Sequence, residues 1–272
     1  MCAMGSIDSS FFDIGRLDAL SSKDSPVHRI DPRLKVLTTL YFIAIAISFD
    51  KYDPAGPVPL LVYPMTLMII GEIPFSYIAK KLLIASPFVL SVALFNPILD
   101  RCPMLNLGPI SVSGGLVSFA SIMTKYVLTV SAVLALIACT GLDSICSALA
   151  RMGVPKAFTI QLLFLYRYIF VLGEEAARMT RARALRSFGG KGLGMSVYSS
   201  MIGHLLLRTV DRAQRIHLAM LCRGFDGEIR HGEPSKIRLS DLLFLAGWCA
   251  LFTLLRLYDF PAWLGKGLGR LL

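Results

Sequence analysis

Long apolar runs separated by short polar segments occupy most of this chain. We interpret five of the runs as transmembrane helices, at residues 32–49, 57–71, 82–99, 116–140 and 242–258. A bilayer core about 30 Å thick needs roughly 20 helical residues, so the short, proline-containing run 57–71 is expected to be a kinked span. Asp31 followed by Pro32 predicts the start of the first helix, because Asp is a favoured N-cap and Pro fits the first turn. Residues 100–115 are expected to form a Pro/Gly-rich loop.

A sixth apolar run, residues 156–173, precedes the most basic part of the chain. Its interpretation depends on charge, because cytoplasmic loops of membrane proteins are enriched in Lys and Arg. If this run crossed the membrane as well, residues 178–238, with twelve Lys and Arg, would be exported. A cytoplasmic N-terminus and five spans keep them inside. We therefore predict a long inner-side helix from about residue 155 to 188, with an ordinary transmembrane helix as the alternative.

The neighbouring segments complete a predicted platform. In LDSICSALARMGVP, residues 142–155, apolar residues recur at helical spacing, so this segment can lie flat at the membrane interface. Glycines break the long helix near residue 190, and a second helix is expected from about residue 196 to 223. The predicted fold is an all-α membrane protein with about five transmembrane helices plus a cytoplasmic-side platform of interfacial and coupling helices. The expected divisions are an N-terminal cytoplasmic segment, transmembrane helices 1–4, the cytoplasmic coupling-helix region, and the last transmembrane helix with its tail, at residues 1–31, 32–140, 141–238 and 239–272.

Composition and charge support the membrane assignment. Of the 272 residues, 55% are hydrophobic and 17% charged, and the net charge is +10. Soluble domains rarely combine these values. Much of the basic excess lies in one block between hydrophobic segments, which is typical of positive-inside topology rather than of nucleic-acid binding. The expected surroundings are therefore the lipid bilayer, and no nucleic acid is expected as a partner.

Sequence patterns of catalysis and metal binding are missing. The glycine-rich stretches at residues 189 and 265 lack the spacing and the Ser/Thr of a phosphate-binding loop, so this chain is not expected to hydrolyse ATP. The six cysteines have no CxxC or CxxH spacing, and the four histidines form no close cluster. We expect neither a metal site nor a cofactor bound by this chain.

Lys125 is a charge about ten residues inside the fourth apolar run, too deep for easy snorkelling. Its ammonium group either faces a protein partner or pairs with a backbone carbonyl, unless the helix begins later than the pattern suggests. It is also the one candidate for a polar pathway, which a stand-alone secondary transporter or channel would need.

Two stretches nearly repeat each other, ARALRSFGG at residues 182–190 and AMLCRGFDG at residues 219–227. Both read Ala, three residues, Arg, a small residue and Phe. Helix capping accounts for Arg followed by a small residue, but not for Ala and Phe. A small residue, an arginine fork and an aromatic anchor are ingredients of a docking surface. The candidate docking residues are Arg186, Arg223, Ala182, Ser187, Phe188, Ala219, Gly224 and Phe225, with capping alone as the alternative.

These motifs resemble those of a known family, the T components (EcfT) of energy-coupling-factor transporters, and specifically its CbiQ branch. The likeness covers nearly the whole chain. SPVHRIDPRLKVL resembles the segment before the first span, LARMGVPKAF the interfacial turn, and the two repeated stretches the ends of two coupling helices. The resemblance implies docking into acidic grooves of two CbiO-like ATPase subunits through two motifs, Leu185-Arg186-Ser187 and Cys222-Arg223-Gly224.

The resemblance also implies a separate, metal-binding S component, CbiM-like and with or without a CbiN-like subunit. The expected function is therefore that of a non-catalytic coupling (T) subunit of an energy-coupling-factor ABC transporter for cobalt uptake in the cell (inner) membrane. ATP would be hydrolysed by the partner subunits, and this chain would transmit their motions to the S component. The alternatives are a stand-alone secondary transporter or channel, and the same T role for nickel or a vitamin.

Overall fold

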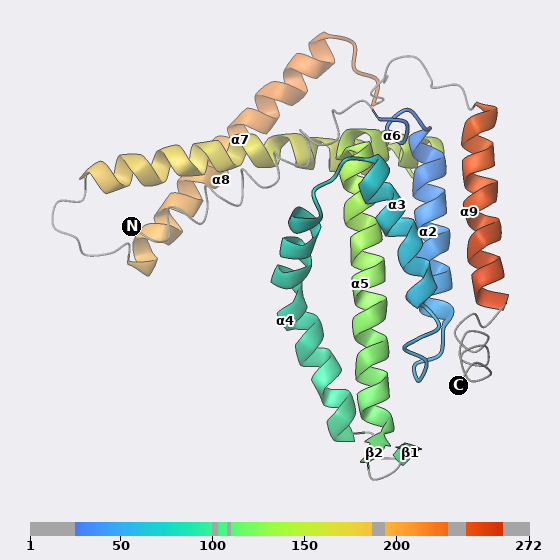
Figure 1. Ribbon diagram of the computed structural model, residues 1–272. Helices are drawn as coiled ribbons and strands as arrows, with labels where there is room; N and C mark the ends of the chain where they lie inside the picture. Colours follow the sequence, from blue (N-terminus) through green and yellow to red (C-terminus); the bar gives the residue numbers. More distant parts are fainter. Residues whose placement is uncertain (1–24, 100–102, 108–109, 187–193, 228–237, 258–272) are drawn as a thin grey trace. The chain divides into compact units, whose positions relative to one another are not determined.

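The structure is a computed structural model that describes residues 25–99, 103–107, 110–186, 194–227 and 238–257 (Figure 1). Its helices are α2 (Pro32–Ser48), α3 (Val62–Ile70), α4 (Phe75–Leu99), α5 (Gly114–Thr140), α6 (Leu142–Arg151), α7 (Lys156–Arg186), α8 (Met195–Cys222) and α9 (Leu239–Leu257). A 3-10 turn, η1 (Val58–Leu61), precedes α3. The expected all-α membrane fold is confirmed.

One small hairpin departs from the expected loop between the third and fourth runs. Strand β1 (Pro103–Leu107) pairs antiparallel with β2 (Ile110–Ser113), and Leu107 lies opposite Ile110. The two residues between the strands in the sequence are Gly and Pro, which favour tight turns. The proline and glycine content predicted a loop, whereas the described residues on either side of positions 108 and 109 pair as two short strands.

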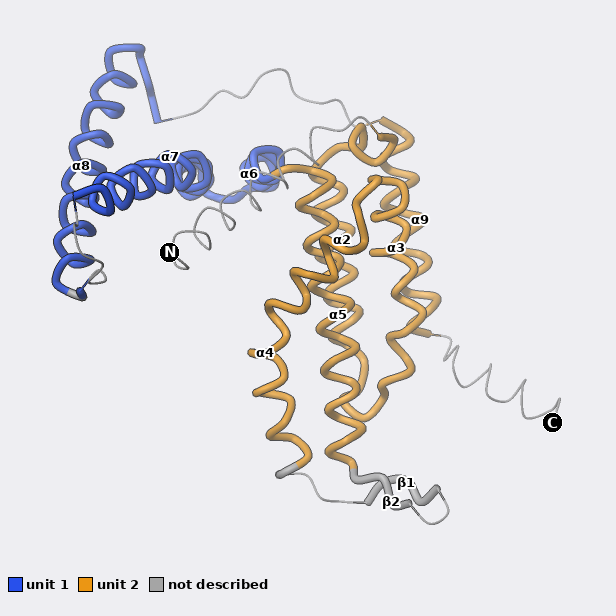
Figure 2. Tube along the Cα trace, turned by 60° about the vertical axis from the view of Figure 1, so that its left-hand side comes forward, with its two compact units in different colours: residues 1–18, 142–234 blue, residues 19–141, 235–272 orange. Residues whose placement is uncertain are grey.

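The chain forms two compact units (Figure 2). One comprises residues 1–18 and 142–234 and contains α6, α7 and α8; we call it the α6–α8 unit. The other comprises residues 19–141 and 235–272 and contains the remaining described helices and the hairpin; we call it the bundle unit. All five predicted spans belong to the bundle unit. The sixth apolar run belongs to α7 and therefore to the α6–α8 unit.

Aromatic rings form the core of the bundle unit, in which α2 packs against α5 and α9 while α3 and α4 pack against α5. Phe42, Tyr63 and Phe252 are almost completely buried, and their ring centroids lie 4.9 to 5.2 Å apart. The Tyr63 hydroxyl lies 2.8 Å from the Thr39 hydroxyl, a hydrogen bond that satisfies the buried phenol. Buried residues of α5 are mostly small, which lets neighbouring helices approach closely: Gly114, Gly115, Ser118, Ser121, Ser131, Ala132, Ala135 and Ala138.

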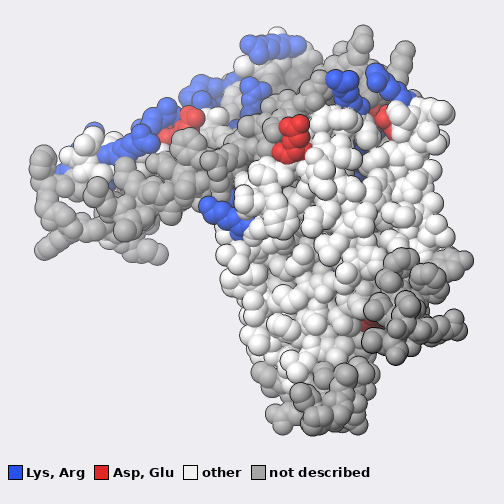
Figure 3. All heavy atoms as spheres, in the orientation of Figure 1, with Lys and Arg blue, Asp and Glu red and all other residues white. Residues whose placement is uncertain are grey.

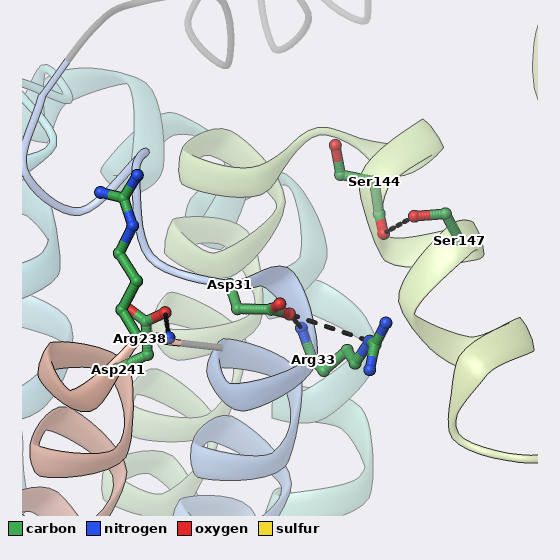
Figure 4. A network of polar contacts seen from close by, with 6 residues as sticks. All are labelled: Asp31, Arg33, Ser144, Ser147, Arg238 and Asp241. Atoms are coloured by element: carbon green, nitrogen blue, oxygen red, sulfur yellow. Dashed lines mark hydrogen bonds and ion pairs between the residues drawn. The ribbon is translucent and has the colours of Figure 1, made fainter. Parts of the chain in front are cut away.

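Two buried carboxylates fix the N-termini of α2 and α9 (Figure 4). Asp31 Oδ1 accepts a hydrogen bond from the backbone N–H of Arg33 at 2.9 Å, so the predicted N-cap is confirmed. Asp241 Oδ2 accepts from the backbone N–H of Arg238 at 3.1 Å, the pattern of an acidic residue in the first turn that bonds back to the N-cap amide. Both helices therefore begin at defined residues.

Helix α4 has an exposed, apolar surface of the kind found on membrane-embedded helices. It is 25 residues long and begins earlier than the predicted span, and Pro87 and Pro97 lie within it. Most of the face that it presents in Figure 3 carries no charge. Large apolar side chains are exposed along it: Leu83, Ile84, Phe88, Leu90, Val92, Leu94 and Phe95. An extended apolar surface of this kind requires lipid or protein around it.

By length and composition, four described helices could cross a membrane: Phe75–Pro97, Gly114–Thr140, Lys156–Arg186 and Leu239–Leu257. The predicted span 57–71 is not one continuous α-helix, because prolines without a backbone N–H produce the 3-10 turn η1 before the nine-residue α3. Helix α2, with 17 residues, is about 25 Å long. The protein is a multi-pass membrane protein. Because α7 also meets the length criterion, five spans against six stays a prediction.

Candidate docking site

The first repeated stretch lies at the end of α7. The predicted short helix α6 ends near Gly153, whose φ of +99° suits glycine, and α7 starts after Pro155, whose carbonyl accepts from the amide of Phe158. Helix α7 is apolar first and basic last, with Arg183 and Arg186 in the final turn. Arginine there interacts favourably with the negative end of the helix dipole. Arg186 is the last residue of the helix and is exposed. The candidates Ser187 and Phe188 lie outside the described residues.

The second repeated stretch forms the end of α8. Arg223 is the C-cap, and Gly224 follows with a φ of +77°. The amide of Phe225 donates to the carbonyl of Met220 at 3.0 Å, and the amide of Gly224 donates to that of Leu221 at 3.0 Å. These two bonds form a Schellman motif, in which glycine takes the left-handed position and a hydrophobic residue follows. The sequence Arg-Gly-Phe is thus also a complete helix stop.

This geometry corrects one part of the sequence interpretation. Capping does account for Phe225, because this residue occupies the position after the left-handed glycine where hydrophobic residues usually occur. Its ring is half-buried, and it lines the same cavity as Met220. Capping therefore accounts for Arg223, Gly224 and Phe225 together. It does not account for Ala219, which is exposed one turn earlier.

Helices α7 and α8 cross within the α6–α8 unit (Figures 1 and 2), and a cavity lies on each side of the crossing. The first, called here the apolar wedge, has a volume of about 750 Å³ and is lined mainly by Phe164, Leu165, Tyr168, Ile169, Ile216, Met220 and Phe225. The second, called the basic wedge, has about 760 Å³ and is lined by Glu175, Arg178, Met179, Ala182, Arg183, Arg186, Met201, His204 and Arg208.

The crossing point carries an ion-pair network centred on Glu175. Arg178, one turn further along α7, donates to Glu175 Oε2 at 2.8 Å. Arg208 of α8 donates to Glu175 Oε1 at 2.5 Å. These hydrogen bonds, first that of Arg208 and then that of Arg178, lower the pKa of the Glu175 carboxyl. No local sequence spacing predicts the contact with Arg208, because this residue lies 33 positions after Glu175 and on another helix.

The structure does not bring the two candidate arginines together. Arg186 and Ala182 line the basic wedge, beside the first half of α8, whereas Arg223 ends the other half of α8. Among the residues that the structure describes, neither guanidinium has a hydrogen-bond or ion-pair partner. The α6–α8 unit therefore presents two separate basic helix ends, each with an uncommitted arginine.

Lys125 has a different environment, at the C-terminal end of α2. Its Nζ donates to the carbonyl of Phe49 at 2.5 Å and to that of Asp50 at 3.4 Å. Arg256 of α9 donates to the carbonyl of Ser48 at 3.1 Å and lies 4.7 Å from the centre of the Phe49 ring. Of the alternatives for Lys125, the structure shows pairing with a carbonyl. Two cations thus cap the carbonyls that end α2.

No group of three or more His, Cys, Asp or Glu side chains that could hold a metal ion occurs in the described ranges. The α6–α8 unit combines an exposed arginine at the end of each long helix with an apolar wedge and a basic wedge on two crossed helices. The class defined by the fold is a multi-pass membrane protein with a separate compact unit of crossed helices.

The CbiQ family model, described as "Cobalt transport protein", matches residues 23–234. The chain belongs to this family. It is 28% identical to the energy-coupling factor transporter transmembrane protein EcfT of Heliobacterium modesticaldum over 221 residues, 75% of this chain and 81% of the relative. It is 36% identical to the cobalt transport protein CbiQ of Rhodobacter capsulatus over 85 residues, 31% of this chain and 35% of the relative. A putative fused cobalt transport protein CbiMQ of Methanocorpusculum labreanum is 33% identical over 91 residues, 32% of this chain and 15% of the relative.

Proposed function

We propose that this chain is the coupling (T) subunit of an energy-coupling-factor importer for cobalt, and that it has no catalytic activity of its own. Two CbiO-like ATPase subunits would bind the ends of α7 and α8. A separate CbiM-like S component, with or without a CbiN-like subunit, would hold the metal. Residues 141–238 would form the coupling region.

One observation carries this proposal: two exposed arginines, Arg186 and Arg223, each terminate a long helix of one unit and have no partner among the described residues. An arginine fork matches a carboxylate and forms charge-assisted hydrogen bonds with it. Two such ends suit two copies of one acidic partner. The relatives' names support transport by an assembled complex, because EcfT is named as a transmembrane protein of a transporter and CbiMQ as a fusion.

The mechanism is mechanical coupling. An α-helix is stiff over the lengths of α7 and α8, so an ATPase that holds one end can rotate the helix when it closes or separates from its partner. The rotation would be passed to the S component in the membrane, where the metal is bound. Arg186 and Arg223 are the attachment points in this account.

Cobalt as the transported ion is part of the proposal and is supported by the family description and by the CbiQ relative's name. The alternative of a stand-alone channel relied on Lys125 as the polar group of a pathway, but Lys125 already donates to the end of α2. The cell (inner) membrane, with the N-terminus and the coupling region cytoplasmic, is part of the proposal and is supported by the distribution of Lys and Arg.

The test is charge reversal at both helix ends. In Arg186→Glu with Arg223→Glu, binding of the ATPase subunits should weaken by at least about 30-fold, because disrupting a buried interfacial charge pair costs about 2 kcal/mol or more. Cobalt uptake should be lost. Arg167→Glu with Arg215→Glu changes the same net charge at exposed positions on the same two helices, outside both wedges, and should retain ATPase binding and cobalt uptake. Unchanged ATPase recovery and uptake in the first variant would reject the proposal.

A further inference from the structure

Glu175 is the one acidic side chain among those that line the basic wedge. Arg178 holds one of its carboxylate oxygens from the same helix, and Arg208 of α8 holds the other. The exposed fraction of the Glu175 side chain is 21%, against 63% and 64% for the two arginines, so the carboxylate is the enclosed centre of the network. It links α7 to α8 directly.

Little apolar packing supports the same crossing. None of the described residues of α8 is buried. In α7, Thr159 and Gly173 are the only buried residues among those that the structure describes. Gly173 lies two residues before Glu175 and has no side chain to interlock with a neighbour. In most helix pairs, interdigitated side chains set the crossing angle. At this crossing few side chains are buried, which leaves the contact between Glu175 and Arg208 as one that can orient the two helices.

Because both helices are long, a small rotation at the crossing produces a large displacement of their ends. Arg186 lies roughly 17 Å beyond Glu175 along α7, and Arg223 roughly 22 Å beyond Arg208 along α8, at 1.5 Å per residue. A rotation of about 10° at the crossing would therefore move these ends by about 3 and 4 Å. That displacement exceeds the range of about 0.5 Å over which a hydrogen bond keeps good geometry.

We propose that Glu175 is a positioning residue whose bond to Arg208 sets the angle between α7 and α8. The angle fixes the separation of Arg186 and Arg223, so that the two ends transmit motion of the ATPase subunits together. Arg178 keeps the carboxylate turned toward α8. The inference rests on the proposed docking function of the two arginines.

The experiment measures the distance between spin labels on the two helices in the full complex. Labels at Ala184→Cys and Gln214→Cys lie at exposed positions on either side of the crossing, in a background without other reactive cysteines. Glu175→Gln removes the charge and keeps the shape, and Glu174→Gln is its neighbour-matched control. Glu175→Arg with Arg208→Glu exchanges the two charges and restores an attractive pair.

We expect Glu175→Gln to shift the label distance by about 1 to 2 Å or to broaden it by as much, because the labels lie about 14 and 9 Å from the crossing, and to lower cobalt uptake several-fold. Glu174→Gln should leave the distance distribution unchanged. Glu175→Arg with Arg208→Glu should restore the position and width of the distribution seen in the unmodified chain. The melting temperature should hardly change, because an ion pair whose arginines are mostly exposed contributes little to folding stability. A distance distribution in Glu175→Gln identical to that of the unmodified chain would overturn the inference, as would an exchanged pair that stays as broad as Glu175→Gln.

Recovery of the ATPase subunits separates this inference from the proposed function. Glu175→Gln retains Arg186 and Arg223, so the ATPases should still co-purify while uptake falls. Charge reversal of the two arginines should abolish co-purification without changing the label distance in the isolated chain. If reversal leaves recovery intact but Glu175→Gln alters the distance, the docking role fails and the positioning role of Glu175 stands.

Discussion

Three consecutive residues at the end of α8 have separate physical roles. Arg223 is the C-cap and presents its guanidinium to the surroundings, Gly224 takes a φ of +77°, and Phe225 bonds back to Met220. A side chain at Gly224 would meet no atom within 4 Å, so its requirement for glycine is conformational rather than steric. The direction of Arg223 therefore depends on the residue that follows it.

Gly224→Ala should loosen the end of α8, because an L-residue in the left-handed region costs about 1 kcal/mol relative to glycine. The amides of Gly224 and Phe225 should exchange with deuterium about fivefold faster, since about 1 kcal/mol of local opening energy corresponds to that factor. ATPase binding should weaken in parallel.

Gly203→Ala is the matched control, because Gly203 lies inside α8 and also has nothing within 4 Å of an added Cβ. Alanine is favoured over glycine in a helix interior, so this change should stabilise α8. Equal exchange at the end of α8 in both variants would contradict the role assigned to Gly224.

At the scale of elements, the sequence predicted where helices start and stop, because those points depend on neighbouring residues. It did not predict contacts between residues far apart in the chain. Asp31 before Pro32 located the start of α2 because an N-cap acts on amides two residues away. Helix α4 begins at Phe75, before the apolar run that predicted it, because a helix can extend past its apolar part and include the charged residues Lys80 and Lys81. The contact between Glu175 and Arg208 joins two helices, and no pattern within either helix contains it.

Gly71 makes the packing of α3 against α5 sensitive to a single methyl group. A Cβ at Gly71 would lie 2.7 Å from Cys139 Sγ and 2.7 Å from the carbonyl oxygen of Leu67, so atoms must shift. We expect Gly71→Ala to cost about 1 to 3 kcal/mol and to lower Tm by roughly 2 to 10 °C. Thermal unfolding of the purified chain in detergent checks this.

Gly247→Ala in α9 is the control for this substitution, because nothing lies within 4 Å of the added Cβ. It should leave Tm unchanged or raise it slightly, since alanine favours the helix. Adding Cys139→Ala to Gly71→Ala should recover part of the lost Tm, because it removes the contact with Cys139 Sγ. The recovery should be incomplete, since the contact with the Leu67 carbonyl remains. An unchanged Tm in Gly71→Ala would show that α3 does not pack against α5 as described.

At the scale of the whole molecule, the account depends on which elements cross the membrane. Hydropathy alone admits α7 as a span, whereas the count of Lys and Arg favours an inner position for it and for α8. The structure separates α6, α7 and α8 from the other described helices as one compact unit. If these helices bind ATPases, their ends must face the cytoplasm and become covered in the assembled transporter.

Cys222 offers a native probe of this claim, because it is exposed next to Arg223 while Cys139 and Cys146 are buried. The most direct measurement is the labelling of Cys222 by a membrane-impermeant maleimide, in a chain whose other cysteines are replaced, with and without the ATPase subunits. We predict labelling from the cytoplasmic side of inside-out vesicles only, and at least about tenfold slower labelling in the assembled complex, because a docked partner excludes the reagent. Labelling from the external side, or equal rates with and without the ATPases, would contradict the account.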